Sequence, residues 1–194
     1  MQNTGTRERK PRADALRNRA LILEVAQKHF LEYGVGTSLE AVAKDAGIGT
    51  GTLYRHFPTR EDLVAGVMQL HADELEAKRS HIMTIADPDE ALAQWLLALE
   101  DYFSAYNGLP GPLVAAAQAG HENSPLALPC ERNVETTDEL LAAAQENGRA
   151  RPMIKGSDLF NVVASTAWLR SNCGVADVPV ESMRDIMSNG YNQA

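Results

Sequence analysis

Apolar side chains recur every three or four positions between residues 16 and 30, which is the spacing of one face of a helix. The pattern predicts an amphipathic helix that ends near Tyr33 and Gly34. Such a helix buries its apolar stripe and leaves the opposite face in water. The stripe consists of Leu16, Ala20, Leu23, Ala26 and Phe30.

Two shorter helices are predicted next, with a tight turn between them. Thr37 and Glu40 match a capping box, in which the Thr37 hydroxyl accepts a hydrogen bond from the Glu40 amide. The helix that begins there ends at Gly47, which tolerates a left-handed conformation. Segment 50–57 predicts a further helix, which Pro58 cannot continue. Two short helices around a glycine turn are typical of a helix-turn-helix.

Longer helices are predicted for the rest of the chain. Thr59 and Asp62 indicate the cap of a long helix towards Ile82. Pro88 opens another helix, whose apolar stripe concentrates four aromatic side chains on one face. That face is either ordinary core or the wall of a pocket for a small molecule. The stripe is Leu92, Trp95, Leu96, Leu99, Tyr102, Phe103 and Tyr106, and its off-stripe neighbours Glu100 and Asp101 are expected in solvent.

The C-terminal pattern predicts one short helix among the loops of 107–130 and a helix from about Val134 to Asn147. Ser157 is expected to cap the next helix, which is apolar on nearly every side through residue 171. A helix buried on more than one face in so small a chain indicates contact with a second subunit, with Val163 as an outward position. A last helix is expected over 180–187 and could flank that interface.

Composition narrows the class of protein. The chain has 194 residues, of which 44% are hydrophobic and 23% charged, so a disordered or fibrous protein is excluded. The two cysteines, Cys130 and Cys173, are too few for a disulfide framework, and residues 1–20 do not resemble a signal peptide. No segment is expected to span a membrane, because Gly108 and the prolines around it break the longest uncharged stretch. A cytoplasmic protein is the expectation.

The charge is unevenly distributed along the chain. The net charge is −8, yet residues 1–62 carry ten basic and eight acidic side chains. The remaining residues carry eight basic and eighteen acidic ones. Phosphate would repel the acidic body, so the N-terminal end is the part predicted to meet a polyanion. A solvated tail without a function is the alternative.

Four blocks in order resemble the tetracycline-repressor (TetR/AcrR) family of transcriptional regulators over residues 14 to about 66. The resemblance implies an all-α protein with an N-terminal three-helix helix-turn-helix DNA-binding domain at 13–62, preceded by a flexible basic arm at 1–12. A helical ligand-binding and dimerisation domain would occupy 63–194. The blocks are Thr37-Ser38-Leu39-Glu40-Ala41-Val42-Ala43, Ala46-Gly47-Ile48, Gly51-Thr52-Leu53-Tyr54-Arg55-His56-Phe57 and Arg60-Glu61-Asp62-Leu63.

The resemblance also implies a DNA-binding surface on segment 50–56, which would enter the major groove of a palindromic operator. Hydroxyl and imidazole groups there suit phosphate contacts, whereas Arg55 is the candidate for a bidentate base contact. Tyr54 could instead be a packing residue, and His56 could bond a neighbouring helix. Where the family often has Ser then Lys, this chain has Gly49 and Thr50. The predicted DNA-binding residues are Thr37, Thr50, Thr52, Tyr54, Arg55, His56 and Arg60.

The function expected from these features is that of a homodimeric, ligand-responsive regulator, most often a repressor in this family. A small, largely apolar effector would bind among the body helices and release the DNA. The predicted effector residues are Met68, Trp95, Leu99, Tyr102, Phe103 and Trp168.

Two other classes of function compete with this reading. A helical enzyme lacks support, because no histidine has metal-ligand spacing, no glycine loop suits a phosphate and Cys130 has no base nearby in sequence. His71 and Glu74 are favoured as a surface or core pair over a metal site, and no catalytic residue, metal or cofactor is predicted. A protein-interaction module that has lost DNA binding would carry acids on its recognition face, and the sequence has none between Thr50 and Thr59.

Overall fold

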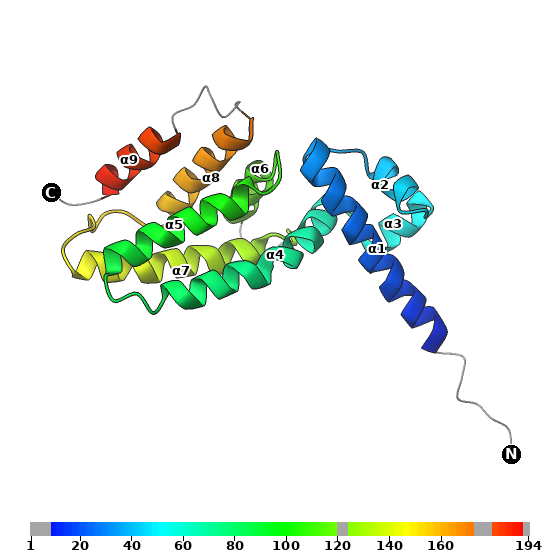
Figure 1. The fold of residues 1–194 in the computed structure, drawn as a ribbon, viewed down its shortest axis with the longest axis horizontal. Coiled ribbons are helices and arrows are strands. Elements are labelled where there is room, and N and C mark those ends of the chain that lie inside the picture. Colours follow the sequence, from blue (N-terminus) through cyan, green and yellow to red (C-terminus); the bar gives the residue numbers. More distant parts are fainter. Residues whose placement is uncertain (1–8, 120–123, 173–179, 192–194) are drawn as a thin grey trace, which may run out of the picture.

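The computed structural model describes residues 9–119, 124–172 and 180–191 (Figure 1). Nine α-helices and no strands are present in those ranges. The all-α expectation is confirmed. The helices are α1 (Arg9–Tyr33), α2 (Leu39–Asp45), α3 (Thr50–His56), α4 (Arg60–Ile82), α5 (Pro88–Ser104), α6 (Pro110–Ala119), α7 (Ala127–Glu146), α8 (Gly156–Asn172) and α9 (Val180–Tyr191).

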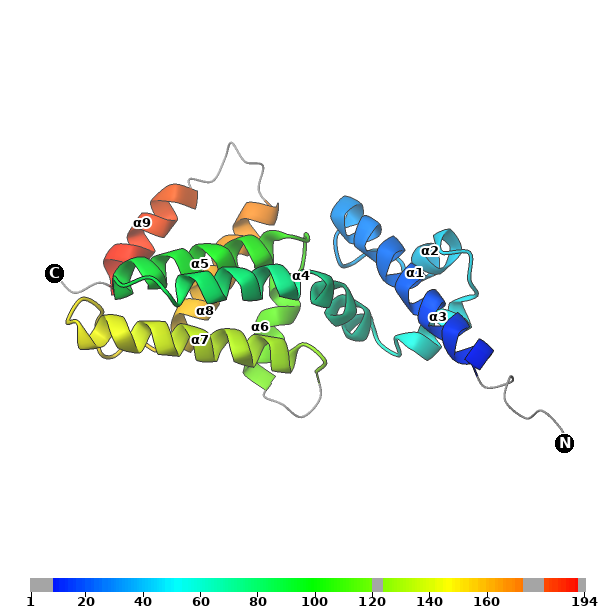
Figure 2. The ribbon, with the colours of Figure 1, turned by 60° about the horizontal axis from the view of Figure 1, so that its bottom comes forward.

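The N-terminal unit is built by the second half of α1, by α2 and α3, and by the start of α4 (Figure 2). Leu23, Phe30 and Leu53 are buried in its core. The first half of α1 projects away from the molecule, and Leu16 is 66% exposed, so its expected place in the core is wrong. Residues 9–12 were expected in the flexible arm but are helical.

The caps of the short helices differ in part from the expectation. Ser38, not Thr37, is the N-cap of α2, and its side chain accepts a hydrogen bond from the amide of Ala41. Gly47 has a φ of 65°, as the turn between α2 and α3 requires. At α4 the predicted cap is confirmed, because the Thr59 side chain accepts from the Asp62 amide and the Asp62 carboxylate accepts from the Thr59 amide.

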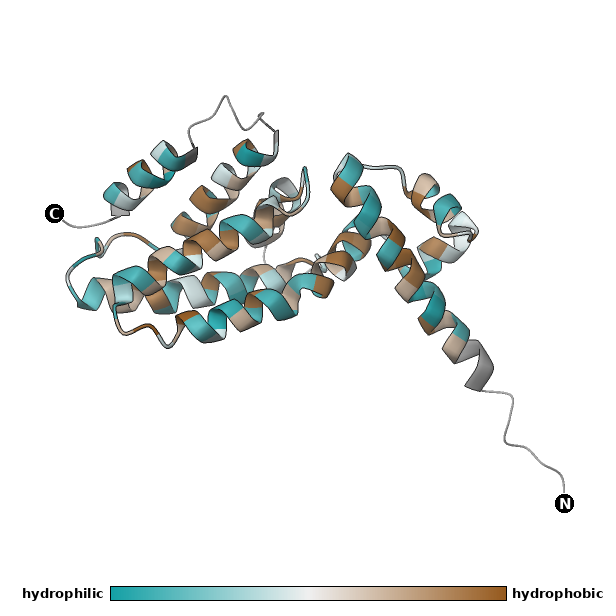
Figure 3. Cartoon of the chain, viewed as in Figure 1, coloured by the Kyte–Doolittle hydropathy of each residue, from teal (hydrophilic) through white to brown (hydrophobic). Residues whose placement is uncertain are grey.

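α4 runs from the N-terminal unit into the body, where α5, α7 and α8 pack closely on one another (Figure 1). Apolar residues line their facing sides, and hydrophilic ones cover the outside (Figure 3). Along α4 the side chains of Leu63, Val67 and Leu75 are buried, whereas Leu70 is 47% exposed. α4 therefore belongs to both units, since it packs against α1 at its start and against α5 in the body.

Three helix limits in the body differ from those expected. α7 begins at Ala127, before the expected start at Val134. α8 begins at Gly156, and the Asp158 carboxylate accepts from the amide of Lys155 in its first turn, so Ser157 is not the cap. α9 continues to Tyr191, past its expected end at 187.

Two predicted orientations are wrong. Val163 has no exposed surface, because this side of α8 packs into its own protomer, so it is no outward position. Glu100 is only 1% exposed, although solvent was expected. Arg184 of α9 donates two hydrogen bonds of 2.8 Å to its carboxylate, and Arg170 of α8 lies 3.5 Å away. A charge this deeply buried needs such partners.

Candidate DNA-binding surface and effector cavity

α3 presents a polar face outside the core of the N-terminal unit. Leu53 is fully buried and fixes the orientation of the helix, because it anchors the opposite face. Thr52 and His56 are half-buried, whereas Tyr54 and Arg55 are exposed. With 41% of its surface exposed, Tyr54 is not buried as a packing residue.

Arg55 lies along its own helix. Its Nε donates to the carbonyl of Gly51 at 3.1 Å, and its Nη2 donates to Thr52 Oγ1 at 3.3 Å. Both hydrogen bonds are exposed to solvent, so water can replace them and the free-energy cost of rotating the side chain away is small. The guanidinium can therefore leave the helix and reach a base edge.

Arg60 has a structural role that the sequence did not indicate. Its Nη1 donates to the carbonyls of Val35 at 2.8 Å and Thr37 at 2.6 Å. These bonds hold the segment between α1 and α2 against the start of α4. A phosphate contact by Arg60 stays a prediction, as do contacts by the half-buried Thr37 and Thr50.

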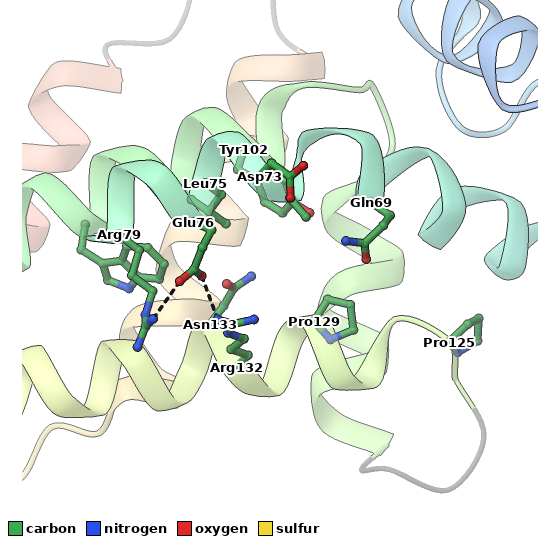
Figure 4. Close-up of a pocket in the computed structure, with 12 residues that line it drawn as sticks. Gln69, Asp73, Leu75, Glu76, Arg79, Tyr102, Pro125, Pro129, Arg132 and Asn133 are labelled. Atoms are coloured by element: carbon green, nitrogen blue, oxygen red, sulfur yellow. Dashed lines mark hydrogen bonds and ion pairs between the residues drawn. The ribbon is translucent and has the colours of Figure 1, made fainter. Parts of the chain in front are cut away.

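The body contains a cavity of about 440 Å³ between α4, α5 and α7 (Figure 4). This volume is in the range of small-molecule sites. Its floor is apolar, and its rim carries charged side chains. The lining consists of Gln69, Ala72, Asp73, Leu75, Glu76, Arg79, Trp95, Tyr102, Pro125, Pro129, Arg132 and Asn133.

Two of the six predicted effector residues, Trp95 and Tyr102, line this cavity. Met68, Leu99 and Phe103 are buried in the core instead, and the Phe103 ring packs edge-on against Phe160 with centroids 5.1 Å apart. These three residues do not line the cavity, so the core alternative describes them better.

Trp168 lies elsewhere on the molecule. It is 48% exposed and borders a separate shallow hollow of about 480 Å³ between α6 and α8. Val114, Ala115 and Leu169 contribute apolar surface to this hollow. The structure therefore does not bring Trp168 together with Trp95 and Tyr102.

The charged rim forms an internal network. Glu76 accepts hydrogen bonds from Arg79 at 3.2 Å and from Arg132 at 2.9 Å, as the dashed lines in Figure 4 mark. Arg79 also donates to Thr136 Oγ1 at 3.0 Å and lies 3.9 Å from Glu139. The two cations thus already have carboxylate partners.

A hydrogen bond fixes Trp95 in the floor of the cavity, and burial keeps the Tyr102 phenol neutral. Trp95 Nε1 donates to Thr137 Oγ1 at 2.9 Å, which satisfies its only polar atom. Burial raises the pKa of Tyr102 to about 12, so its phenol stays protonated at neutral pH. Burial likewise raises the pKa of the Cys130 thiol to about 12. Cys173 lies outside the described residues.

The polar half of the cavity was not predicted from the sequence; it includes Gln69 and Glu76 on α4 and Arg132 and Asn133 on α7. These residues lie far apart in the chain, and charged or amide residues on a helix ordinarily indicate a solvated face. The usable signal is the helical spacing of Gln69, Asp73 and Glu76 on α4.

The segment after α5 is one of two parts of the body that contact the N-terminal unit. After α5, the Asn107 carbonyl accepts a hydrogen bond of 2.8 Å from the amide of Val35. The Tyr106 ring meets Phe30 edge-on, with centroids 6.0 Å apart, and its hydroxyl lies 2.9 Å from His71 Nε2. Tyr106 comes one turn after Tyr102 of the cavity, so this contact joins the two units.

A second contact lies just before α7. Ser124 Oγ donates to Glu61 Oε2 at 3.0 Å, in the first turn of α4. The next residue, Pro125, lines the cavity. The start of α7 thus links the cavity to the α3–α4 corner.

Neither a membrane-spanning helix nor a metal-binding cluster is found among the residues that the structure describes. No helix in the described ranges combines the length and apolarity needed to cross a membrane. The same ranges hold no cluster of three or more histidine, cysteine or acidic side chains suited to a metal ion. His71 and Glu74 lie side by side on α4, with 3.7 Å between His71 Nδ1 and Glu74 Oε2.

Family models match both units. Residues 22–67 match the bacterial regulatory proteins of the tetR family, and residues 87–191 match the SbtR-like transcriptional regulator C-terminal domain. The chain belongs to the TetR family. This is a family of transcriptional regulators and not a class of enzyme.

Curated relatives of this TetR-family chain are helix-turn-helix regulators of Staphylococcus aureus. The regulator SAB2452 is 51% identical over 59 residues, which are 30% of this chain and 32% of the relative. SAUSA300_2515 is 35% identical over 111 residues, or 57% of this chain and 58% of the relative. The chain thus matches less than two thirds of the length of these relatives.

Solved structures resemble most of the chain. The TetR regulator SCO0520 of Streptomyces coelicolor is 29% identical, with a TM-score of 0.55 over 91% of this chain and 99% of that one. AibR, solved with isovaleryl coenzyme A and operator DNA, is 19% identical, with a TM-score of 0.58 over 90% and 96%. Both share the two-unit helical fold.

Proposed function

We propose that this TetR-family protein is a homodimeric repressor that binds a palindromic operator through α3 and leaves it when an effector fills the cavity. The observation that carries the proposal is the outer face of α3, where Tyr54 and Arg55 are exposed while Leu53 anchors the helix. No acidic residue lies between Thr50 and Thr59 to repel phosphate. The DNA-binding unit is assigned to 13–62, and the protein would act in the cytoplasm with the bacterial chromosome.

The dimer contact is assigned to the outer face of α8 and α9. Val162 and Trp168 are each more than 40% exposed there, and Ile186 of α9 is 71% exposed. Large exposed apolar side chains on two neighbouring helices favour burial against a partner. The Glu100 network supports this assignment, because it ties α9 to α5 and α8 within the protomer.

The effector acts through differential binding. It releases DNA only if it binds the non-DNA-binding arrangement more tightly, and a coupling of about 1–3 kcal/mol suffices. α4 and the contacts at Asn107 and Ser124 connect the cavity to the N-terminal unit. A tilt of α4 changes the separation of the two α3 helices in the dimer, which must match one turn of DNA, about 34 Å.

Selection of binding sites from random DNA tests the proposal. Enriched sequences should show dyad symmetry, and affinity should fall steeply between low and moderate salt. Arg55→Ala should cost about 1–3 kcal/mol on the selected operator and relax its base preference, whereas Tyr54→Phe should weaken all duplexes alike. Sites without dyad symmetry, or affinity that does not respond to salt, would contradict the proposed function.

A further inference from the structure

One side chain inside the cavity has a polar group without a partner. Asn133 is 8% exposed, and its side chain points from α7 into the cavity (Figure 4). Within the described ranges, its amide makes no hydrogen bond with another residue; only its backbone carbonyl is used, by Thr137. An amide without a protein partner is ordinarily hydrogen-bonded to water or to a ligand, so this one offers its donor and its acceptor to a group bound in the cavity.

The surfaces around Asn133 accept a ring. Trp95 forms part of the floor but is only 1% exposed, and because its indole N–H is bound to Thr137 the little surface that it offers is aromatic. Leu75 and Pro129 add apolar surface from α4 and α7. A flat apolar body therefore fits beside the Asn133 amide.

The charges of the rim disfavour an ionised ligand. Both guanidinium groups are already bound to Glu76, with Glu139 close to Arg79. A carboxylate would have to displace Glu76 from both cations and would face Asp73 as well. A cation would meet Arg79 and Arg132 at the same rim. A carboxylate would therefore lose hydration without gaining an unpaired partner, and a cation would find only the solvent-exposed Asp73.

From these three features we infer that the effector is an uncharged ring compound with a carboxamide-like group that pairs with the Asn133 amide. The Asn133 side chain both donates and accepts, so it matches a group that does the same. This inference rests on the proposed function, because it assigns the chemistry of the same effector cavity. Asn133 is the specificity-determining residue of the site.

A matched series of naphthalene probes tests the inference. Naphthamide, naphthoate, naphthylmethylammonium and methylnaphthalene share one ring system and differ in charge and hydrogen bonding. Titration calorimetry on the full chain should show naphthamide binding about 10-fold tighter than each of the other three. Naphthoate or the ammonium probe binding as tightly as naphthamide would overturn the inference, as would no detectable binding of naphthamide.

Variants separate the amide from the rest of the site. Asn133→Leu should weaken naphthamide about 10-fold and leave methylnaphthalene unchanged or tighter, while Asn161→Leu on α8 serves as the matched control and should change neither. If Asn133→Leu does not fold by circular dichroism, Asn133→Ser replaces it with the same expectation. Unchanged naphthamide affinity in the folded variant would refute the role of Asn133.

The rim is tested by Glu76→Gln, which leaves Arg79 and Arg132 without their shared carboxylate. Naphthoate affinity should rise about 10-fold, while naphthamide affinity stays within about 2-fold. Unaltered naphthoate binding would contradict the charge argument. Operator binding is measured on the same samples: if it persists while the probes fail, only the effector chemistry is wrong, and if wild-type protein binds no palindromic DNA, the proposed function itself fails.

Discussion

Replacing Gly66 by alanine tests the close packing where α1, α4 and the end of α3 meet. A Cβ at Gly66 would lie 2.8 Å from Leu23 Cδ2 and 2.9 Å from Phe57 Cε1. Both distances are shorter than a carbon–carbon contact, so a side chain must move. The Leu23 methyl can rotate away, but the Phe57 ring is 1% exposed and lies beneath the Arg19 guanidinium at 5.0 Å.

Two opposing effects set the magnitude. Overpacking a filled core costs about 1–3 kcal/mol, whereas exchanging glycine for alanine inside a helix gains about 1 kcal/mol. Because the ring has little room, we expect a net loss of about 1–2 kcal/mol. Phe57 directly follows α3, so displacing its ring also tilts the recognition helix, and operator affinity should fall about 10-fold.

Urea unfolding and fluorescence anisotropy with labelled operator measure the two effects. Gly190→Ala is the matched control, because a Cβ there meets no heavy atom within 4 Å. That variant should be neutral or slightly stabilising and should bind DNA normally. A Gly66→Ala protein with wild-type stability and wild-type operator affinity would refute the packing argument.

Three further predictions concern the body. Trp168→Glu should shift sedimentation from dimer towards monomer without unfolding the protomer, and a variant that stays fully dimeric would move the interface off α8. Arg184→Ala should lower the free energy of unfolding by about 2–3 kcal/mol, since it leaves the buried Glu100 with only Arg170, at 3.5 Å, as a partner; a loss below about 1 kcal/mol in urea would contradict this. In a Cys173→Ser background, Cys130 should resist Ellman's reagent at pH 8, because burial raises its pKa to about 12 and the thiol stays protonated; rapid native-state reaction would argue against that burial.

The N-terminal unit could be read from the sequence because its signals are local. Gly47 and Pro58 determine where short helices end through their own backbone preferences, and the structure agrees at both positions. The cap of α2 shows the limit of such signals. Thr37 and Ser38 both carry a hydroxyl, and only the path of the chain, held by Arg60, decides which one caps the helix.

The position of a side chain in the body could not be predicted in the same way. A helical period of 3.6 residues placed Trp95, Tyr102 and Phe103 on one stripe, but the period does not say which neighbouring helix covers each residue. α7 leaves a cavity over Trp95 and Tyr102, while α8 packs Phe160 against Phe103. Likewise, an all-round apolar helix contains no signal of its outward side, which is why Val163 was misplaced.

Local sequence therefore determined the helices, their main breaks and the polar face of α3, since each depends on residues within one or two turns. The tertiary structure decided which polar groups are buried and what they meet. Glu100 accepts a hydrogen bond from Arg184, which lies 84 positions further along the chain. Asn133 of α7 faces a cavity that α4 also lines. Burial of a polar group depends on elements distant in sequence, and no local pattern encodes them.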